Sequence, residues 1–148
     1  MMTLTTTAFE NGQGIPATYT CDGTDAMPNL TIAGVPKGAK SLAIIMNDPD
    51  SPSGTWTHWT IWNIPPNTTE LLEGKLPQGA VEGKTSFGKT GYGGPCPGKG
   101  EHRYFFTLYA LDTMLTISAD ADVDVVTHAR DGHIMEKTDV MGTYERKK

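Results

Sequence analysis

The sequence predicts a mostly β fold of two packed antiparallel sheets, with one late α-helix and a C-terminal strand. Three observations support this prediction. Short runs of apolar, aromatic and β-branched residues recur along the first three quarters of the chain, and turn residues separate them. The 17 glycines and 10 prolines indicate many turns. Helical periodicity occurs only near the end, without the strand–helix alternation that accompanies a parallel sheet.

Three strong runs predict the central strands. Residues 41–47 (SLAIIMN) have the pattern of a buried strand, and the run stops at an Asp-Pro-Asp unit. Residues 56–64 are rich in aromatic and β-branched side chains and end at a pair of prolines. Residues 103–111 (RYFFTLYAL) form a third continuous run rich in aromatic residues, which indicates a central strand covered on both sides. Weaker strand patterns occupy residues 4–9, 30–32, 80–83 and 140–144.

The segment from Asp120 to about Lys137 predicts the single helix. Aspartates at 120, 122 and 124 give it an acidic start, which suits the positive end of a helix dipole. Apolar residues at 123, 126 and 134 then fall roughly on one side. Gly132 weakens the pattern and marks a place where the helix could break.

Composition limits the classes of protein that remain. A chain of 148 residues predicts a single domain over residues 1–148. The net charge of −5 and the absence of a basic run argue against a nucleic-acid partner. The N-terminus lacks the pattern of a secretory signal, and no apolar stretch approaches the roughly 20 residues of a membrane span. We therefore expect a cytoplasmic protein with no membrane span.

The two cysteines, Cys21 and Cys96, lie far apart and form no CxxC pair, so a structural zinc site is not expected. In the cytoplasm, reduced thiols are the favoured interpretation. The alternative is a disulfide between the N-terminal loop and the 91–100 loop. It requires the two Cα atoms to lie within about 7 Å of each other.

Residues 83–90 (GKTSFGKT) formally match the P-loop pattern of nucleotide-binding proteins. That chemistry needs a helix whose N-terminus follows the motif and faces the phosphates. Here the next residues, GYGGP, cannot start a helix. The match is therefore not interpreted as a nucleotide site.

Strand parity predicts a cluster of polar side chains at one end of the sheet. Trp56 and His58 share one face of their strand, and His102 and Tyr104 share one face of another. Asp48 follows the apolar face of the first central strand. If these strands are neighbours, the carboxylate, the two imidazoles and the phenol converge.

Together these segments identify a resemblance to the phosphatidylethanolamine-binding protein family, which includes the Raf kinase inhibitor protein, and above all to its compact bacterial and archaeal branch. The stretches that match it extend over almost the whole chain. They are YTCDG (19–23), GVPKGAKSL (34–42), DPDSP with TWTHWTIWNIP (48–65), GYGGPCPGKGEHRYFFTLYALD (91–112) and GHIMEKTDVMGTYER (132–146).

The resemblance implies two antiparallel sheets and a small pocket for phosphate-like anions, including phospholipid head groups. Residues carried over as pocket residues are Asp48, Trp56, His58, Gly94, Pro95, His102 and Tyr104. Asp50 and Arg103 are expected to pair and hold the loops, since arginine and carboxylate fit as a fork.

The chemistry of these residue types is consistent with an anion site. Two imidazoles, a phenol and the N–H groups of the glycine-rich loop can all donate hydrogen bonds to an anion. Asp48 can accept from a histidine or meet an ammonium group, and Trp56 provides an aromatic wall. No cofactor and no metal are expected. A kinase or protease partner is implied by the resemblance, because the family contains inhibitors of both.

Three other interpretations remain open. Two histidines and a carboxylate are also the ligands of a metal-dependent enzyme, although the usual carboxylate two residues after the first histidine is replaced by Thr60. Hydrolysis through Ser51, Ser53 or Ser86 is a second alternative, without a GxSxG elbow. A homodimer is expected if the aromatic residues leave an apolar sheet face uncovered.

Overall fold

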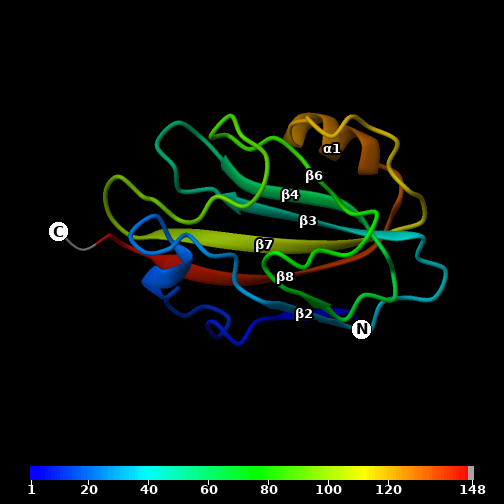
Figure 1. Cartoon of the computed structure of the whole chain (residues 1–148), viewed down its shortest axis with the longest axis horizontal. Coiled ribbons are helices and arrows are strands. Elements are labelled where there is room, and N and C mark those ends of the chain that lie inside the picture. Colours follow the sequence, from blue (N-terminus) through cyan, green and yellow to red (C-terminus); the bar gives the residue numbers. More distant parts are fainter. Residues whose placement is uncertain (147–148) are drawn as a thin grey trace.

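The computed structural model describes residues 1–146 and contains two antiparallel β-sheets (Figure 1). The smaller sheet has the order β1-β2-β5, and its strands are Thr3–Thr5, Leu30–Ala33 and Glu70–Leu71. The larger sheet has the order β6-β4-β3-β7-β8. Its strands are β6 (Val81–Glu82), β4 (Trp56–Ile64), β3 (Ser41–Asp48), β7 (His102–Leu111) and β8 (Ile134–Tyr144). The predicted fold class is confirmed.

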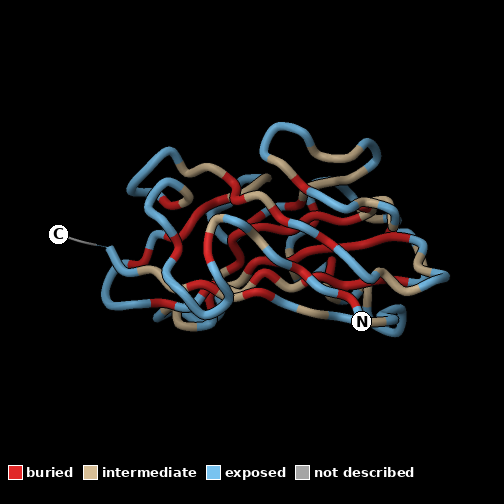
Figure 2. Tube along the Cα trace, turned by 90° about the horizontal axis from the view of Figure 1, so that it is seen from below, coloured by how far each residue is buried: buried red, intermediate tan, exposed pale blue. Residues whose placement is uncertain are grey.

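The core lies on both faces of the larger sheet (Figure 2). On one face, residues such as Ile44 and Phe106 pack against the smaller sheet, including Leu30. On the other face, Trp62 and Tyr109 pack with the short helix α1 (Val123–Arg130). Both faces of the five-stranded sheet are therefore covered. The uncovered face that motivated a homodimer is not found in residues 1–146.

The helix is shorter than predicted, and the second half of the predicted segment is a strand. Asp122 caps α1 by accepting a hydrogen bond from the N–H of Val125 at 3.1 Å. Gly132 then adopts φ 83°, a left-handed conformation that ends the helical path. From Ile134 onward the chain pairs with β7 along the whole of β8. Ladder pairing with a neighbouring strand outweighs the helical pattern of the sequence.

The weaker strand predictions hold in part. β1 ends at Thr5, so the predicted run to Phe9 is too long, and β6 comprises only two of the four predicted residues. β5 and the 3₁₀ turn at Ala17–Tyr19 were not predicted. No helix within residues 1–146 has the length and apolar character needed to cross a membrane.

Candidate ligand-binding pocket

A pocket of about 210 Å³ opens at the end of the larger sheet where β3 ends and where β4 and β7 begin. Five of the residues predicted from sequence line it: Asp48, Trp56, His58, His102 and Tyr104. Six further residues also line it: Ser51, Pro52, Phe87, Cys96, Pro97 and Gly98. The structure thus brings together residues from three strands and from two connecting segments, β3–β4 and β6–β7.

The antiparallel register explains why these side chains meet. Asp48, the last residue of β3, pairs with Trp56, the first residue of β4. On its other side β3 pairs with β7, with Asn47 opposite Phe105, so the start of β7 lies beside Asp48. Loops that are distant in sequence consequently gather at one end of the sheet (Figure 1).

Asp48 and His102 form a buried pair at the base of the pocket. The distance between Asp48 Oδ2 and His102 Nδ1 is 2.6 Å, and the two residues are 3% and 6% exposed. Asp48 Oδ1 accepts a second hydrogen bond, 2.8 Å long, from the N–H of Asp50. Because the carboxylate only accepts, His102 Nδ1 carries the proton. The aspartate therefore fixes the orientation of the ring, as the sequence predicted for one of the two histidines.

The second nitrogen of His102 also faces an acceptor. His102 Nε2 lies 3.2 Å from the carbonyl oxygen of Lys99. Only an imidazolium, with a proton on each nitrogen, donates to both acceptors at once. Both nitrogens of His102 therefore face partners within the protein, and neither is left free to donate to a ligand.

His58 behaves differently from the donor expected from sequence. Its Nδ1 lies 2.8 Å from the carbonyl oxygen of Gly93, so Nδ1 carries the proton and donates. Burial lowers the pKa of His58, although the hydrogen bond to Gly93 opposes the shift. The neutral ring leaves Nε2 as an acceptor. His58 therefore faces a ligand as a hydrogen-bond acceptor near neutral pH.

The lowered pKa of His58 predicts a loss of stability in acid. As the pH falls through 6.5, the ordinary pKa of histidine, the unfolded chain takes up a proton at this position before the folded protein does. The unfolded state then binds more protons, so the free energy of unfolding falls as the pH falls through this window. Urea denaturation above and below pH 6.5 should show a smaller fall for His58→Gln than for the wild type. Equal falls in both proteins would contradict this assignment.

Tyr104 and Trp56 place two unpartnered donors beside these histidines. The Tyr104 hydroxyl and Trp56 Nε1 are buried and make no hydrogen bond of normal geometry within residues 1–146, although the carboxylate of Asp48 and the backbone of Cys96 lie near the hydroxyl. Burial, with the charge of Asp48 second, raises the pKa of Tyr104, so the phenol keeps its proton. Buried polar groups without partners carry a desolvation cost of about 1–3 kcal/mol each. A ligand that accepts hydrogen bonds removes that cost.

Asp50 and Arg103 form the expected fork outside the pocket. Arg103 Nε and Nη2 donate to the two carboxylate oxygens of Asp50 at 2.9 and 2.8 Å, and the N–H of Arg103 adds a third bond at 2.9 Å. The hydrogen bonds from Arg103 lower the pKa of Asp50 to about 2. The pair lies at the surface and links the loop after β3 to β7.

Gly94 and Pro95 lie behind the pocket wall rather than on it. The N–H of Gly94 donates to Asp25 Oδ1 at 2.9 Å, and the N–H of Gly93 donates to the carbonyl of His58 at 2.9 Å. The expected anion nest of backbone donors is therefore not open at these two positions. A Cβ at Gly94 would lie 2.3 Å from the carbonyl oxygen of Tyr19, so only glycine fits this close approach.

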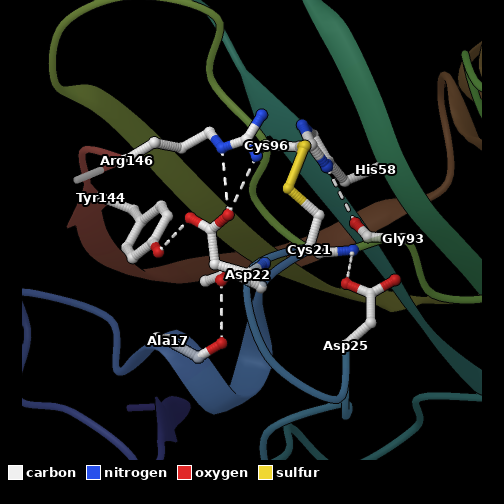
Figure 3. Close-up of a disulfide and its surroundings, with 11 residues drawn as sticks. Ala17, Cys21, Asp22, Asp25, His58, Gly93, Cys96, Tyr144 and Arg146 are labelled. Atoms are coloured by element: carbon white, nitrogen blue, oxygen red, sulfur yellow. Dashed lines mark hydrogen bonds and ion pairs between the residues drawn. A yellow bond between two sulfur atoms is a disulfide. The ribbon is translucent and has the colours of Figure 1, made fainter. Parts of the chain in front are cut away.

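A disulfide joins Cys21, two residues after Tyr19, to Cys96, two residues after Gly94 (Figure 3). The Cα atoms lie 5.4 Å apart, and the N–H of Cys21 also donates to the carbonyl of Pro95 at 3.1 Å. The prediction of two reduced thiols is wrong for this structure, and the disulfide alternative is correct. The sequence alone does not show whether two cysteines 75 positions apart lie close together in the fold.

The alternative chemistries find little support in the geometry. No group of three metal-binding side chains gathers within residues 1–146 in a form that would hold an ion. Ser51 Oγ contacts Ser53 Oγ at 3.4 Å rather than a histidine. Ser86 Oγ accepts from the N–H of Thr57, and no hydrogen bond joins a serine to either pocket histidine in the part of the chain that the structure describes.

Comparisons with known proteins agree with this architecture. A family model described as phosphatidylethanolamine-binding protein matches residues 5–145. A UPF0098 protein of Methanothermobacter thermautotrophicus is 49% identical, over 98% of this chain and 99% of its own. A UPF0098 protein of Aquifex aeolicus is 44% identical, over 94% and 85% of the two chains.

Two solved structures share the fold. One is the homologue of phosphatidylethanolamine-binding protein from Chlamydia trachomatis, with a TM-score of 0.93, 40% identity and coverage of 99% and 98% of the two chains. The other is Escherichia coli YbcL, described as a member of the mammalian family, with a TM-score of 0.93, 33% identity and 99% coverage of both chains. The chain therefore belongs to the phosphatidylethanolamine-binding protein family.

Proposed function

We propose that this protein is a non-catalytic binding protein whose pocket takes small anions of the phosphate-ester class, a class that includes phospholipid head groups. The observation that carries the proposal is the pair of buried, unpartnered donors, Tyr104 Oη and Trp56 Nε1, in one pocket with two histidines. Two such donors match the oxygen acceptors of a phosphate.

The charges in the pocket favour an anion that carries a proton. No lysine or arginine among residues 1–146 lines the pocket, and the carboxylate of Asp48 lies at its base, 2.6 Å from His102. His58 Nε2 accepts rather than donates, so it suits the hydroxyl of a singly protonated phosphate ester. The remaining oxygens accept from the phenol and the indole. The ligand is thus held by directed hydrogen bonds more than by net charge.

A larger hollow lies outside the proposed pocket, but its charges do not suit an anion. A groove of about 530 Å³ lies near the C-terminal strand and is larger than the proposed pocket. Its lining includes the carboxylates of Asp22, Glu101 and Glu145, and within residues 1–146 only Asp22 is paired with an arginine. An anion there would meet like charges. The smaller pocket is chemically the better site.

Titration calorimetry with inorganic phosphate tests the proposal. Tyr104→Phe should weaken binding by about ten-fold or more, because a hydrogen bond to a charged group is worth about 1.5–3 kcal/mol. Tyr109→Phe is the matched control, since Tyr109 is also largely buried but packs on the opposite face of the sheet. Wild-type protein that binds no anion, or equal affinity in Tyr104→Phe, would contradict the proposal.

The family resemblance also predicts action as an inhibitor or modulator of a kinase or a protease. This action stays a prediction, as does a cytoplasmic location. The Cys21–Cys96 disulfide bears on the location, because structural disulfides are typical of oxidising compartments and of intracellular proteins from hyperthermophiles.

A further inference from the structure

The loop between β6 and the glycine-rich segment presents one aromatic side chain, Phe87, at the mouth of the pocket. A tight turn forms the loop. The N–H and the hydroxyl of Thr85 both donate to the carbonyl of Lys89, at 2.8 and 2.9 Å. Gly88 completes the turn with φ 82°, a conformation that favours glycine. Phe87 lies at the tip of this turn.

The turn is tied to β4 in both directions. The N–H of Ser86 donates to the carbonyl of Thr57 at 2.9 Å, and Ser86 Oγ accepts from the N–H of Thr57 at 2.9 Å. Thr57 lies between Trp56 and His58, two residues of the pocket. The position of Phe87 is consequently set relative to the pocket wall rather than left to a free loop.

The ring of Phe87 packs directly on the pocket residues. It meets Trp56 edge-on at a centroid distance of 5.5 Å and His58 edge-on at 5.2 Å. A Cβ at Gly93 would lie 2.7 Å from Cε2 of Phe87, so the ring packs directly against Gly93, where a larger residue would not fit. Even so, 42% of Phe87 is exposed. A large aromatic side chain is therefore held in place with an apolar surface open to a ligand.

The mouth of the pocket around Phe87 is mostly apolar, with Pro52, Trp56 and Pro97 also in the lining. Within residues 1–146 the one carboxylate of the lining is Asp48, which is engaged with His102 at the base. The cationic Nζ of Lys89 already lies 6.0 Å from the centroid of the Phe87 ring. A second cation at this ring would meet like charge. The mouth thus disfavours a ligand with an ammonium group.

We propose that Phe87 is the specificity-determining residue of this pocket and that it selects anions bearing a flat apolar substituent, such as an aryl group. The inference rests on the proposed function, because the anion is held at the base by the residues described above. The substituent then lies between Phe87, Trp56 and the two prolines. Aromatic pairs of this kind contribute about 0.5–1.5 kcal/mol beyond the area that they bury.

Three probe ligands test the inference by titration calorimetry: inorganic phosphate, phenyl phosphate and phosphoethanolamine. Wild-type protein should bind phenyl phosphate about three- to ten-fold more tightly than inorganic phosphate, as the aromatic contribution implies. Phosphoethanolamine should bind no more tightly than inorganic phosphate. In Phe87→Ala the ratio of the phosphate and phenyl phosphate dissociation constants should fall towards one. Phe87→Leu, which keeps an apolar side chain, should retain part of the preference.

Met114→Ala is the matched control. Met114 is 50% exposed and does not line the pocket, so its loss should leave the ratio at the wild-type value. Wild-type protein that binds none of the three ligands would overturn the proposed function. Phosphate binding without a preference for phenyl phosphate, or tighter binding of phosphoethanolamine, would overturn only the role of Phe87. If Phe87→Ala does not fold, the ligand ratios of wild type and Phe87→Leu decide the question.

Discussion

Replacement of both cysteines by serine is expected to lower the free energy of unfolding by about 2–5 kcal/mol. The disulfide joins residues 75 positions apart, and closing so long a loop removes much of the conformational freedom of the unfolded chain. In the folded protein it also ties the Cys21 segment to the loop behind the pocket.

Urea denaturation with and without a dithiol reductant measures the effect. The wild-type midpoint should fall when reductant is added, whereas Cys21→Ser/Cys96→Ser should unfold at the same midpoint in both solutions. The slope with urea should rise in the variant, because its denatured state is less compact. A wild-type midpoint that does not respond to reductant would contradict the prediction. So would rapid reaction of native, unreduced protein with a thiol reagent.

Asp48→Ala is expected to lower the free energy of unfolding by about 3–5 kcal/mol, the usual effect of removing one partner of a buried ion pair. The substitution leaves His102 buried without its acceptor, and it removes the acceptor for the N–H of Asp50. Asp48→Asn should cost much less. The amide oxygen can still accept from Asp50, and the neutral His102 ring can turn its remaining proton towards Lys99.

An exposed pair of the same type supplies the control. His133 Nδ1 lies 2.7 Å from Asp112 Oδ1, almost the same distance as in the buried pair, but both side chains are about half exposed. Asp112→Ala should change the stability by only about 0–1 kcal/mol, because water screens exposed pairs. Similar losses in Asp48→Ala and Asp112→Ala, measured by urea denaturation, would show that burial of the Asp48–His102 pair has no energetic consequence.

The central strands could be predicted from sequence because they are buried on both faces. The run from Ser41 to Asp48 contains the unbroken apolar stretch 42–46, and both sides of β3 pack against other elements. The predicted helix is too long because local periodicity carries no information about pairing with a strand that is distant in sequence. Ile134 and the residues after it pair with β7, whereas an isolated segment of the same sequence reads as the end of a helix.

The candidate site could be predicted in part. Period-two alternation placed Trp56 with His58 and His102 with Tyr104, and the structure brings all four into one pocket with Asp48. The direction of the hydrogen bonds could not be predicted. That His58 donates to Gly93, and that Gly94 donates to Asp25, depends on loops packed from different parts of the chain.

Phe87 was missed for a different reason. It lies in the glycine-rich stretch that formally matches a P-loop. Apart from that match, the sequence of this stretch does not indicate a pocket residue. A large aromatic residue between glycines and lysines was the available signal. Its position against His58 becomes visible only when the turn is folded onto β4.

The most direct test of the account is a crystal structure of the wild-type protein soaked with inorganic phosphate. The account predicts one phosphate within hydrogen-bond distance of the Tyr104 hydroxyl and Trp56 Nε1, with a third oxygen at Nε2 of His58. A phosphate bound elsewhere, for example at the lysine-bearing loops, with this pocket holding only solvent at saturating phosphate, would contradict it.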